Sequence, residues 1–321
     1  MSIDLYGFPN SSNIDTRVFN GNSNVVGGSW HTWVKPRGIS MVYIFMVGAG
    51  GGGGDSVVGA ASLAAGGGGG GCGGQASLLI GADFIPNNLY FSIARGGNNN
   101  TTTSALAGFS SYCCISHPQG APIAQNTLLT VNAGAGGGKS SGSTPGPLGT
   151  AGAITNINTC LLAGGGIYKF TIGLAGVIGS NTAGAALSLP TSGLICCPGT
   201  GGAGNPAANT AGNAGGLITG IALSLFAPVN IPGGAGGATT PTAGSNGIST
   251  PEKIYKNMPI ALGGTGGGST GISATPSGST GGDGGSGGVG SGGGGGGGGF
   301  TGQAIATGGG GGESMAIIVA W

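Results

Sequence analysis

One octapeptide has the spacing of a phosphate-binding loop. Ala133–Ser140 fits the loose pattern in which a glycine-rich loop ends in Gly-Lys-Ser, and an apolar segment at Leu128–Val131 precedes it. A phosphate cradle also needs a helix that begins at the Lys-Ser pair, so that its first amides point at the phosphates. Here Ser140–Pro147 follows, and its two prolines and two glycines exclude a helix. In so glycine-rich a chain the match is expected by chance, so we predict no nucleotide or other cofactor.

Acid–base groups are scarce and scattered. General acid–base catalysis needs two titratable side chains close together, and His31 and His117 are the only histidines. Serine and threonine are abundant, but no nucleophile elbow surrounds any of them. We therefore predict that the chain is not an enzyme and has no catalytic residues. The carboxylates are Asp4, Asp15, Asp55, Asp83, Glu252, Asp283 and Glu313.

The cysteines do not have metal-ligand spacing. No two of them form a C-x-x-C pair, and the proximity of His117 to Cys114 gives too few ligands for zinc. We therefore predict no metal site. The two Cys-Cys pairs end apolar runs, which favours buried, small hydrophobic side chains. The six cysteines are Cys72, Cys113, Cys114, Cys160, Cys196 and Cys197.

The composition excludes several classes of protein. Glycine supplies 83 of 321 residues, charged residues make up 5%, and the formal net charge is +1. Glycine does not recur strictly at every third position, which excludes collagen. Eight scattered Lys and Arg residues cannot form a phosphate-neutralising track, so no nucleic-acid partner is expected.

Targeting segments are not evident. Met1–Asn10 lacks the basic start and long apolar stretch of a signal peptide. The best apolar run, Ile39–Val47, is about half the length that a membrane helix needs. We expect synthesis in a cytosol without membrane insertion.

Two parts of the chain differ in character. Residues 1–28 are rich in Asn and Ser and poor in long glycine runs, which predicts an attachment segment or a first strand. Residues 29–321 form a glycine-rich β domain. Its clearest strand is Ile39–Val47, with many β-branched and aromatic residues, and the apolar end Ala316–Trp321 is its natural partner.

Between these two strands, apolar runs alternate with glycine tracts. The only helix-like piece is Pro251–Met258, one or two turns long. The sequence therefore predicts an all-β fold, with a β-sandwich-like base made by the N- and C-terminal strands and with glycine-rich insertions. The further expected strands are Ala76–Ile80, Leu89–Ile93, Thr127–Val131, Ile167–Ile172, Leu187–Leu189, Leu194–Cys197 and Leu217–Phe226.

The glycine tracts allow two interpretations. Composition alone is typical of flexible linkers. However, the tracts alternate with strands, and those near the two ends lie side by side if the ends pair. Backbones without side chains can approach closely, so helices of polyproline II geometry could hydrogen-bond to several neighbours. We therefore predict an ordered polyglycine II-like lattice that includes Gly284–Gly299.

The order of elements resembles the glycine-rich domain of bacteriophage tail-fibre and adhesin proteins. In that domain Trp and Val-Pro-x-Gly-Val precede an alternating strand and a glycine run, as Trp33–Val42 and Val47–Gly53 do here, although Lys35 replaces the usual residue before Pro36. The resemblance covers Trp30–Lys139 and about Gly281–Trp321. Residues 140–280 would be an enlarged glycine-rich insertion.

The resemblance implies a virion protein, made in the host cytoplasm and displayed on the particle exterior. In such adhesins, loops between glycine tracts at the far end contact a host surface glycan or an outer-membrane protein, and the fibres are commonly homotrimeric. The segment 1–28 would then dock on other virion proteins. The alternatives are a head fibre, capsid decoration or minor capsid protein with a purely structural role, and a non-viral glycine-rich surface protein. The candidate host-binding loops are Asn98–Ser104, Tyr112–Gln125 and Ala238–Ser249.

Overall fold

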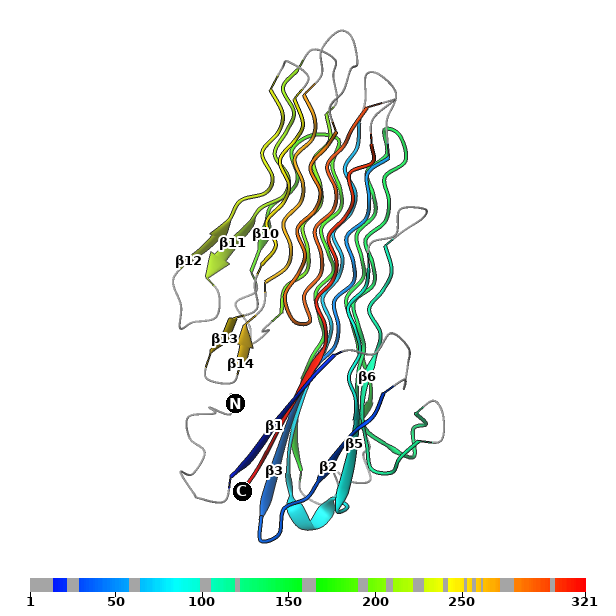
Figure 1. Cartoon of the computed structure of the whole chain (residues 1–321), viewed down its shortest axis with the longest axis vertical. Helices are drawn as coiled ribbons and strands as arrows, with labels where there is room; N and C mark the ends of the chain where they lie inside the picture. The colour runs from blue at the N-terminus through cyan, green and yellow to red at the C-terminus, as the bar shows by residue number, and fades with distance from the viewer. Residues whose placement is uncertain are drawn as a thin grey trace.

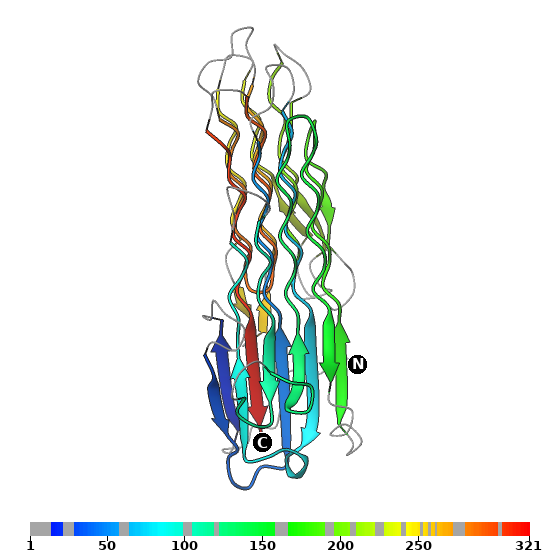
Figure 2. The same ribbon diagram turned by 90° about the vertical axis from the view of Figure 1, so that its right-hand side faces the viewer.

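Two five-stranded sheets lie at one end of an elongated molecule, and glycine-rich segments run from them to the other end (Figures 1 and 2). We call these parts the base and the rod. The structure is a computed structural model of the whole chain, and the fold is all-β, as the sequence predicts. The residues that it describes are 14–21, 29–57, 64–98, 105–118, 122–157, 166–189, 196–205, 210–221, 228–238, 242–250, 253–255, 258–260, 262–271, 280–300 and 304–321.

The first sheet of the base brings the two ends of the described chain together. Its order is β1-β15-β3-β4-β9, and all its pairs are antiparallel. The predicted pairing of the C-terminal strand with Ile39–Val47 is confirmed, with Met315 opposite Val47 and Ala320 opposite Val42. The strands are β1 (Asp15–Asn20), β15 (Met315–Ala320), β3 (Met41–Val47), β4 (Gln75–Gly81) and β9 (Ile167–Thr171).

The second sheet of the base has the order β2-β5-β6-β7-β8 and is also antiparallel. A single 3₁₀ turn among the described residues, η2 (Ala82–Phe84), follows β4. The strands are β2 (His31–Val34), β5 (Asn88–Ser92), β6 (Ser111–Cys114), β7 (Thr127–Val131) and β8 (Ile154–Ile157). Two smaller sheets lie outside the base: β10 (Leu187–Ser188), β11 (Ile218–Ile221) and β12 (Pro228–Ile231), and the hairpin β13 (Lys253–Tyr255) and β14 (Met258–Ile260).

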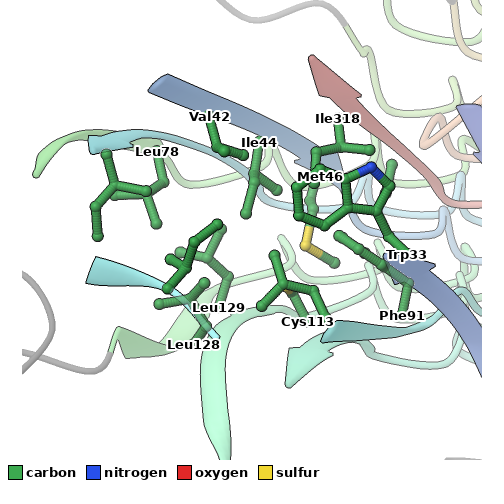
Figure 3. Packing of buried hydrophobic residues seen from close by; sticks show 14 of the residues in the cluster. Trp33, Val42, Ile44, Met46, Leu78, Phe91, Cys113, Leu128, Leu129 and Ile318 are labelled. Atoms are coloured by element: carbon green, nitrogen blue, oxygen red, sulfur yellow. The ribbon is translucent and has the colours of Figure 1, made fainter. Parts of the chain in front are cut away.

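The core of the base lies between its two sheets (Figure 3). Ile44, Leu78 and Ile318 of the first sheet pack in one buried cluster with Phe91 and Leu129 of the second. The other faces of β3 and β15 are also covered, by a second cluster that includes Tyr43, Phe45 and Ile317. Strands buried on both faces need continuous apolar sequences, which explains why these two strands have the longest apolar runs in the chain.

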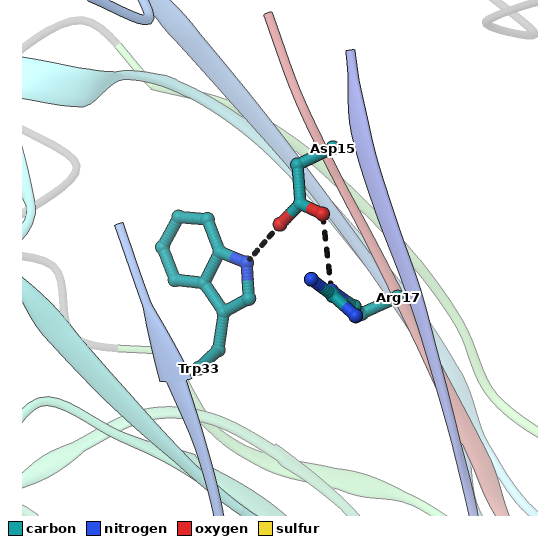
Figure 4. Close-up of polar contacts among 3 residues, drawn as sticks. All are labelled: Asp15, Arg17 and Trp33. Atoms are coloured by element: carbon teal, nitrogen blue, oxygen red, sulfur yellow. Dashed lines mark hydrogen bonds and ion pairs between the residues drawn. The ribbon is translucent and has the colours of Figure 1, made fainter. Parts of the chain in front are cut away.

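A hydrogen bond joins the edge strands of the two sheets (Figure 4). The indole N–H of Trp33 in β2 donates to the Asp15 carboxylate in β1, with Nε1 and Oδ2 3.1 Å apart. The other carboxylate oxygen pairs with Arg17 at 3.0 Å. Trp33 is only 2% exposed, so its N–H needs a partner, and Asp15 supplies it.

Adjacent tracts of the rod are hydrogen-bonded at every third residue. Three residues of the tract that leaves β3 donate to the tract that enters β4, at N···O distances of 2.7–2.9 Å. The same tract bonds to two other neighbours through its intervening residues. A period of three, with successive residues directed at different neighbours, is that of the polyproline II geometry. The donor–acceptor pairs to the first neighbour are Gly48 to Gly74, Gly51 to Gly71 and Gly54 to Gly68.

The bonds to the other two neighbours keep the same period. Gly50 and Gly53 donate to Gly312 and Gly309, at 2.8 and 2.7 Å. From the third neighbour, Gly134, Gly137 and Ser140 donate to the carbonyls of Ala49, Gly52 and Asp55. Each tract is therefore held from several sides, so the rod is a bundle of bonded backbones.

The close approach of these backbones leaves no room for side chains. A Cβ added to Gly53 would lie 2.0 Å from the carbonyl oxygen of Gly294, and one on Gly70 would lie 2.1 Å from that of Gly51. Both distances are far below any normal Cβ contact, and both obstacles are backbone atoms that cannot rotate away. The close packing of backbones thus explains why the rod is rich in glycine.

The structure corrects one sequence prediction and describes part of residues 1–28. The helix predicted over Pro251–Met258 is wrong, because Lys253–Tyr255 and Met258–Ile260 pair as an antiparallel hairpin. One or two isolated helical turns cannot repay the cost of helix nucleation, whereas two strands pair directly. Within residues 1–28, Asp15–Asn20 forms a strand of the base, and residues 1–13 and 22–28 lie outside the described part.

Candidate functional site

The candidate site is the end of the rod away from the base, where tracts reverse direction. One described reversal is a tight hairpin in which Ser141 and Thr144 exchange backbone hydrogen bonds of 3.0 and 2.9 Å. Gly142 has a φ of +56°, in the left-handed region that favours glycine. Ser143 is exposed at the tip, so this reversal presents a short hydroxyl group to solvent.

A second described reversal follows the tract that leaves β9. The Thr182 N–H donates to Ser180 Oγ at 3.0 Å, and the two hydroxyl oxygens lie 3.3 Å apart. The carbonyl of Thr182 accepts from the N–H of Gly204 at 2.8 Å, which fixes the turn on a neighbouring tract. The Thr182 side chain is exposed. Both reversals are thus neutral and carry hydroxyl groups that can donate and accept hydrogen bonds.

A buried asparagine organises the tract ends nearby. Asn205 is fully buried, and its Nδ2 donates to the carbonyls of Ala211 and Thr270 at 3.3 and 3.2 Å. Its Oδ1 accepts from the Thr210 hydroxyl at 2.8 Å. Because both the NH₂ and the carbonyl oxygen of this buried side-chain amide are hydrogen-bonded, Asn205 fixes the positions of three tracts relative to one another along the rod.

Asp55 is the buried carboxylate of the rod. Its Oδ1 accepts from the Gly308 N–H at 2.8 Å, and its Oδ2 is buried without a hydrogen-bond partner. Burial raises the pKa of Asp55, although the Gly308 hydrogen bond and the charge of Lys139 act to lower it. Asp283, which accepts from the N–H and hydroxyl of Thr307 at 2.7 and 3.0 Å, also raises the pKa of Asp55. The one signal for this site in the sequence is a lone acidic residue directly after a glycine run.

The phosphate-loop-like octapeptide is part of the rod. The N–H groups of Gly134, Ala135, Gly137 and Gly138 all donate to backbone carbonyls of other tracts. Ser140 is used as well, since its N–H donates to Asp55 and its hydroxyl accepts from Val57. These amides are therefore committed to hydrogen bonds within the bundle.

The predicted binding loops lie partly in other elements of the structure. Within Tyr112–Gln125, residues 112–114 belong to β6 in the base, away from the far end of the rod. Within Ala238–Ser249, residues 242–249 form a tract, because Gly244 and Gly247 donate to Thr280 and Asp283. For Asn98–Ser104, only Asn98 lies in the described part. Two of the three predicted loops therefore include residues of a strand or a tract, because short polar residues occur there as well as in turns.

The cysteines of the described chain are buried, as the sequence predicts. Cys113 and Cys114 lie in β6, and burial raises the pKa of Cys114 to about 11. Cys72 and Cys196 belong to the cluster that covers the outer faces of β3 and β15, and Cys197 packs with Leu189 and Ile218. Within the described ranges no group of three His, Cys, Asp or Glu side chains is placed to hold a metal ion. No helix of the described chain is long and apolar enough to cross a membrane.

No family model matches the chain, and the search of curated proteins finds no match.

Proposed function

We propose that this chain is a virion protein of the tail-fibre or adhesin type, which binds the host cell surface through the far end of its rod. The observation that carries this proposal is the separation of the two ends of the molecule. The described terminal strands β1 and β15 pair in the base, whereas the reversals at Ser141–Thr144 and Asn181–Ala183 lie at the other end of the tracts (Figure 2). A rigid spacer between an anchored end and a presented end suits a receptor-binding fibre.

The chemistry of the reversals supports a neutral ligand. Ser143 and Thr182 offer hydroxyl groups, and neither reversal carries a charged residue. Such groups suit hydrogen bonding to a surface glycan or to polar loops of an outer-membrane protein, both being the ligand classes that the resemblance implies.

Competition for cells tests this function. Soluble protein added to host cells should reduce infection, and a Ser143→Arg, Thr182→Arg double variant should compete less well. Thr32→Arg, at an exposed position of β2 in the base, is the matched control and should compete like the wild type. Failure of the wild-type protein to bind host cells, together with its location on capsid vertices in a particle reconstruction, would favour the head-fibre or capsid-decoration alternative.

We also propose that the chain forms a homo-oligomer, a trimer by the resemblance, through the open edge of the first sheet. β9 is an edge strand, and Ile167, Tyr168 and Phe170 are 58%, 47% and 52% exposed. Exposed Ile172 and Ile178 continue this apolar stripe along the rod. The stripe presents roughly 500 Å² per copy, so pairing buries about 1,000 Å², the lower bound for a specific interface.

Oligomeric state can be measured directly by light scattering after gel filtration. Phe170→Lys should reduce the apparent mass to that of a monomer, since it places a charge in the interface. Val34→Lys, at a similarly exposed position in the edge strand β2 of the other sheet, is the control and should leave the mass unchanged. A monomeric wild-type protein at micromolar concentration would refute the oligomer.

Docking on other virion proteins is proposed for residues 1–13. The deletion used to test it must spare β1, because removal of all of residues 1–28 would also remove a strand of the base. Particles that incorporate the protein without residues 1–13 as efficiently as the intact chain would contradict the docking role.

A further inference from the structure

Two thiols from distant parts of the sequence meet where the rod joins the base. Cys72 lies in the tract that enters β4, and Cys196 begins the described tract 196–205. Both side chains are fully buried in one cluster with Val47 and Val289. The inserted region and the base therefore contact each other through this pair of cysteines.

The contacts of the two sulfur atoms are specific. The two thiols lie close enough for each to change the pKa of the other. The backbone N–H of Leu174 donates to Cys72 Sγ at 2.9 Å. Cys196 Sγ lies 3.4 Å from the carbonyl oxygen of Gly73, the residue that follows Cys72. Cys196 Sγ therefore lies beside the residue next to Cys72, and both side chains belong to one buried cluster.

The two thiols differ in acidity. The Cys196 side chain lowers the pKa of Cys72, and the Leu174 N–H acts in the same direction. The Cys72 side chain and burial raise the pKa of Cys196. Since the thiolate is the reactive form, Cys72 is the nucleophile of the pair and Cys196 is the proton-bearing partner.

We propose that Cys72 and Cys196 form a disulfide when a peroxide reaches them, and that this bond fastens the inserted tracts to the base. The Cys72 thiolate attacks one oxygen of hydrogen peroxide, breaks the O–O bond and becomes a sulfenic acid, releasing hydroxide. Cys196 sulfur then attacks the Cys72 sulfur, and the sulfenic oxygen leaves as water with the Cys196 proton. In total, two thiols are oxidised and one peroxide is reduced to two waters. The proposal does not depend on the virion function.

The other described cysteines are poorly placed for this reaction. Cys197 adjoins Cys196, but a bond between neighbouring residues would distort their shared peptide group. Its N–H donates to Ser291 Oγ at 3.1 Å, and burial raises the pKa of its thiol. Cys113 and Cys114 lie in β6 of the second sheet, and neither belongs to the cluster that holds Cys72 and Cys196.

The disulfide would connect residues 72 and 196 and close a long loop. Long loops lose much conformational freedom in the unfolded chain when they are closed, so the oxidised protein should be more stable. For a chain of this size we expect the midpoint of thermal unfolding to rise by roughly 5–10 °C on oxidation. Reduction with dithiothreitol should reverse the shift.

Peptide mapping tests the pairing. The reduced, folded full-length protein, with Cys160→Ser to remove the cysteine outside the described part, is treated with hydrogen peroxide. It is then alkylated without reduction and digested for mass spectrometry. A cross-linked peptide that joins Cys72 to Cys196, with the upward shift of the midpoint, is the expected result. Cys114→Ser and Cys197→Ser should keep both, and Cys196→Ser should lose both.

Several results would overturn the proposal. One is that Cys72 and Cys196 are both recovered as alkylated thiols at peroxide concentrations that fully oxidise free glutathione. The others are that Cys72 becomes a sulfinic acid without a cross-link, or that a cross-link forms to another cysteine. If Cys196→Ser fails to fold, the map of the protein that retains both Cys72 and Cys196 still decides between these outcomes.

Discussion

Two neighbouring glycines of the last tract offer a sharp test of the bundle. A Cβ added to Gly311 would lie 2.3 Å from the carbonyl oxygen of Gly50, whereas one added to Gly310 would have no heavy atom nearer than 3.9 Å. Neither glycine has a positive φ. Gly311→Ala and Gly310→Ala therefore differ in packing alone.

The expected magnitude follows from the hydrogen bonds at Gly50. Real Cβ contacts do not fall below 3.0 Å, so in Gly311→Ala the Gly50 carbonyl must move by about 0.7 Å away from the new methyl group. That carbonyl accepts from the Gly97 N–H at 2.8 Å, and the Gly50 N–H donates to Gly312 at 2.8 Å. Loss of two buried hydrogen bonds costs roughly 2–5 kcal/mol, which exceeds the gain of about 0.4–1 kcal/mol from the stiffer unfolded chain.

Urea or thermal unfolding followed by circular dichroism measures both variants. Gly311→Ala should lose roughly 2–4 kcal/mol of unfolding free energy, and Gly310→Ala should be neutral or slightly more stable. Equal stabilities for the two variants would refute the backbone packing described above. Equal and large losses would indicate that the tract tolerates no alanine anywhere, which steric contact with Gly50 does not explain.

Three further predictions concern other parts of the molecule. Amides of Gly292–Gly298 donate to neighbouring tracts, so their hydrogen exchange should be slow, and fast exchange in the folded protein would contradict an ordered bundle. Burial raises the pKa of Asp55, so the folded protein binds the Asp55 proton more tightly than the unfolded chain does, where the pKa of aspartate is about 3.9. The contribution of Asp55 to stability is therefore fully present below about pH 3.9. It is lost as the pH rises through the pKa of the folded state. Asp55→Asn should therefore stabilise the protein more at pH 7 than at pH 3 in urea titrations, and a pH-independent difference would exclude this cause. Trp33→Phe leaves Asp15 without the indole N–H and removes buried volume, so it should lower the unfolding free energy by about 2–3 kcal/mol in the same assay. Arg17→Ala removes only an exposed ion pair with Asp15 and should lower it by less than about 1 kcal/mol. Similar losses in the two variants would show that the indole hydrogen bond contributes little.

The sequence was informative wherever side chains specify a strand. The runs at Thr127–Val131 and Ile167–Ile172 are rich in β-branched and apolar residues, and they form β7 and β9 within one residue of the predicted bounds. The pairing of Ala316–Trp321 with Ile39–Val47 was also predictable, because an uncharged apolar chain end has to be covered. Both predictions depend on the residues of a short segment alone, and such segments can be recognised even in a chain of low complexity.

The arrangement of the tracts could not be predicted in the same way. Gly51 and Gly70 both lie within runs of glycine, and nothing in such a run says which carbonyl each amide meets. Their partners are fixed by the distant strands that each tract continues. The polar residues Asp55 and Asn205 were overlooked for a related reason, since their burial depends on tracts far away in the chain.

The three-residue bonding period has a consequence for how such a gene can change. Adding three codons at matching heights of neighbouring tracts lengthens each by one turn, about 9 Å, and leaves every donor facing its former acceptor. One or two added codons turn all later amides toward the wrong neighbour along the remaining tract. Inherited differences in rod length should therefore come in multiples of three residues, whereas the lengths of the reversals at Ser141–Thr144 and Asn181–Ala183 are not tied to this period.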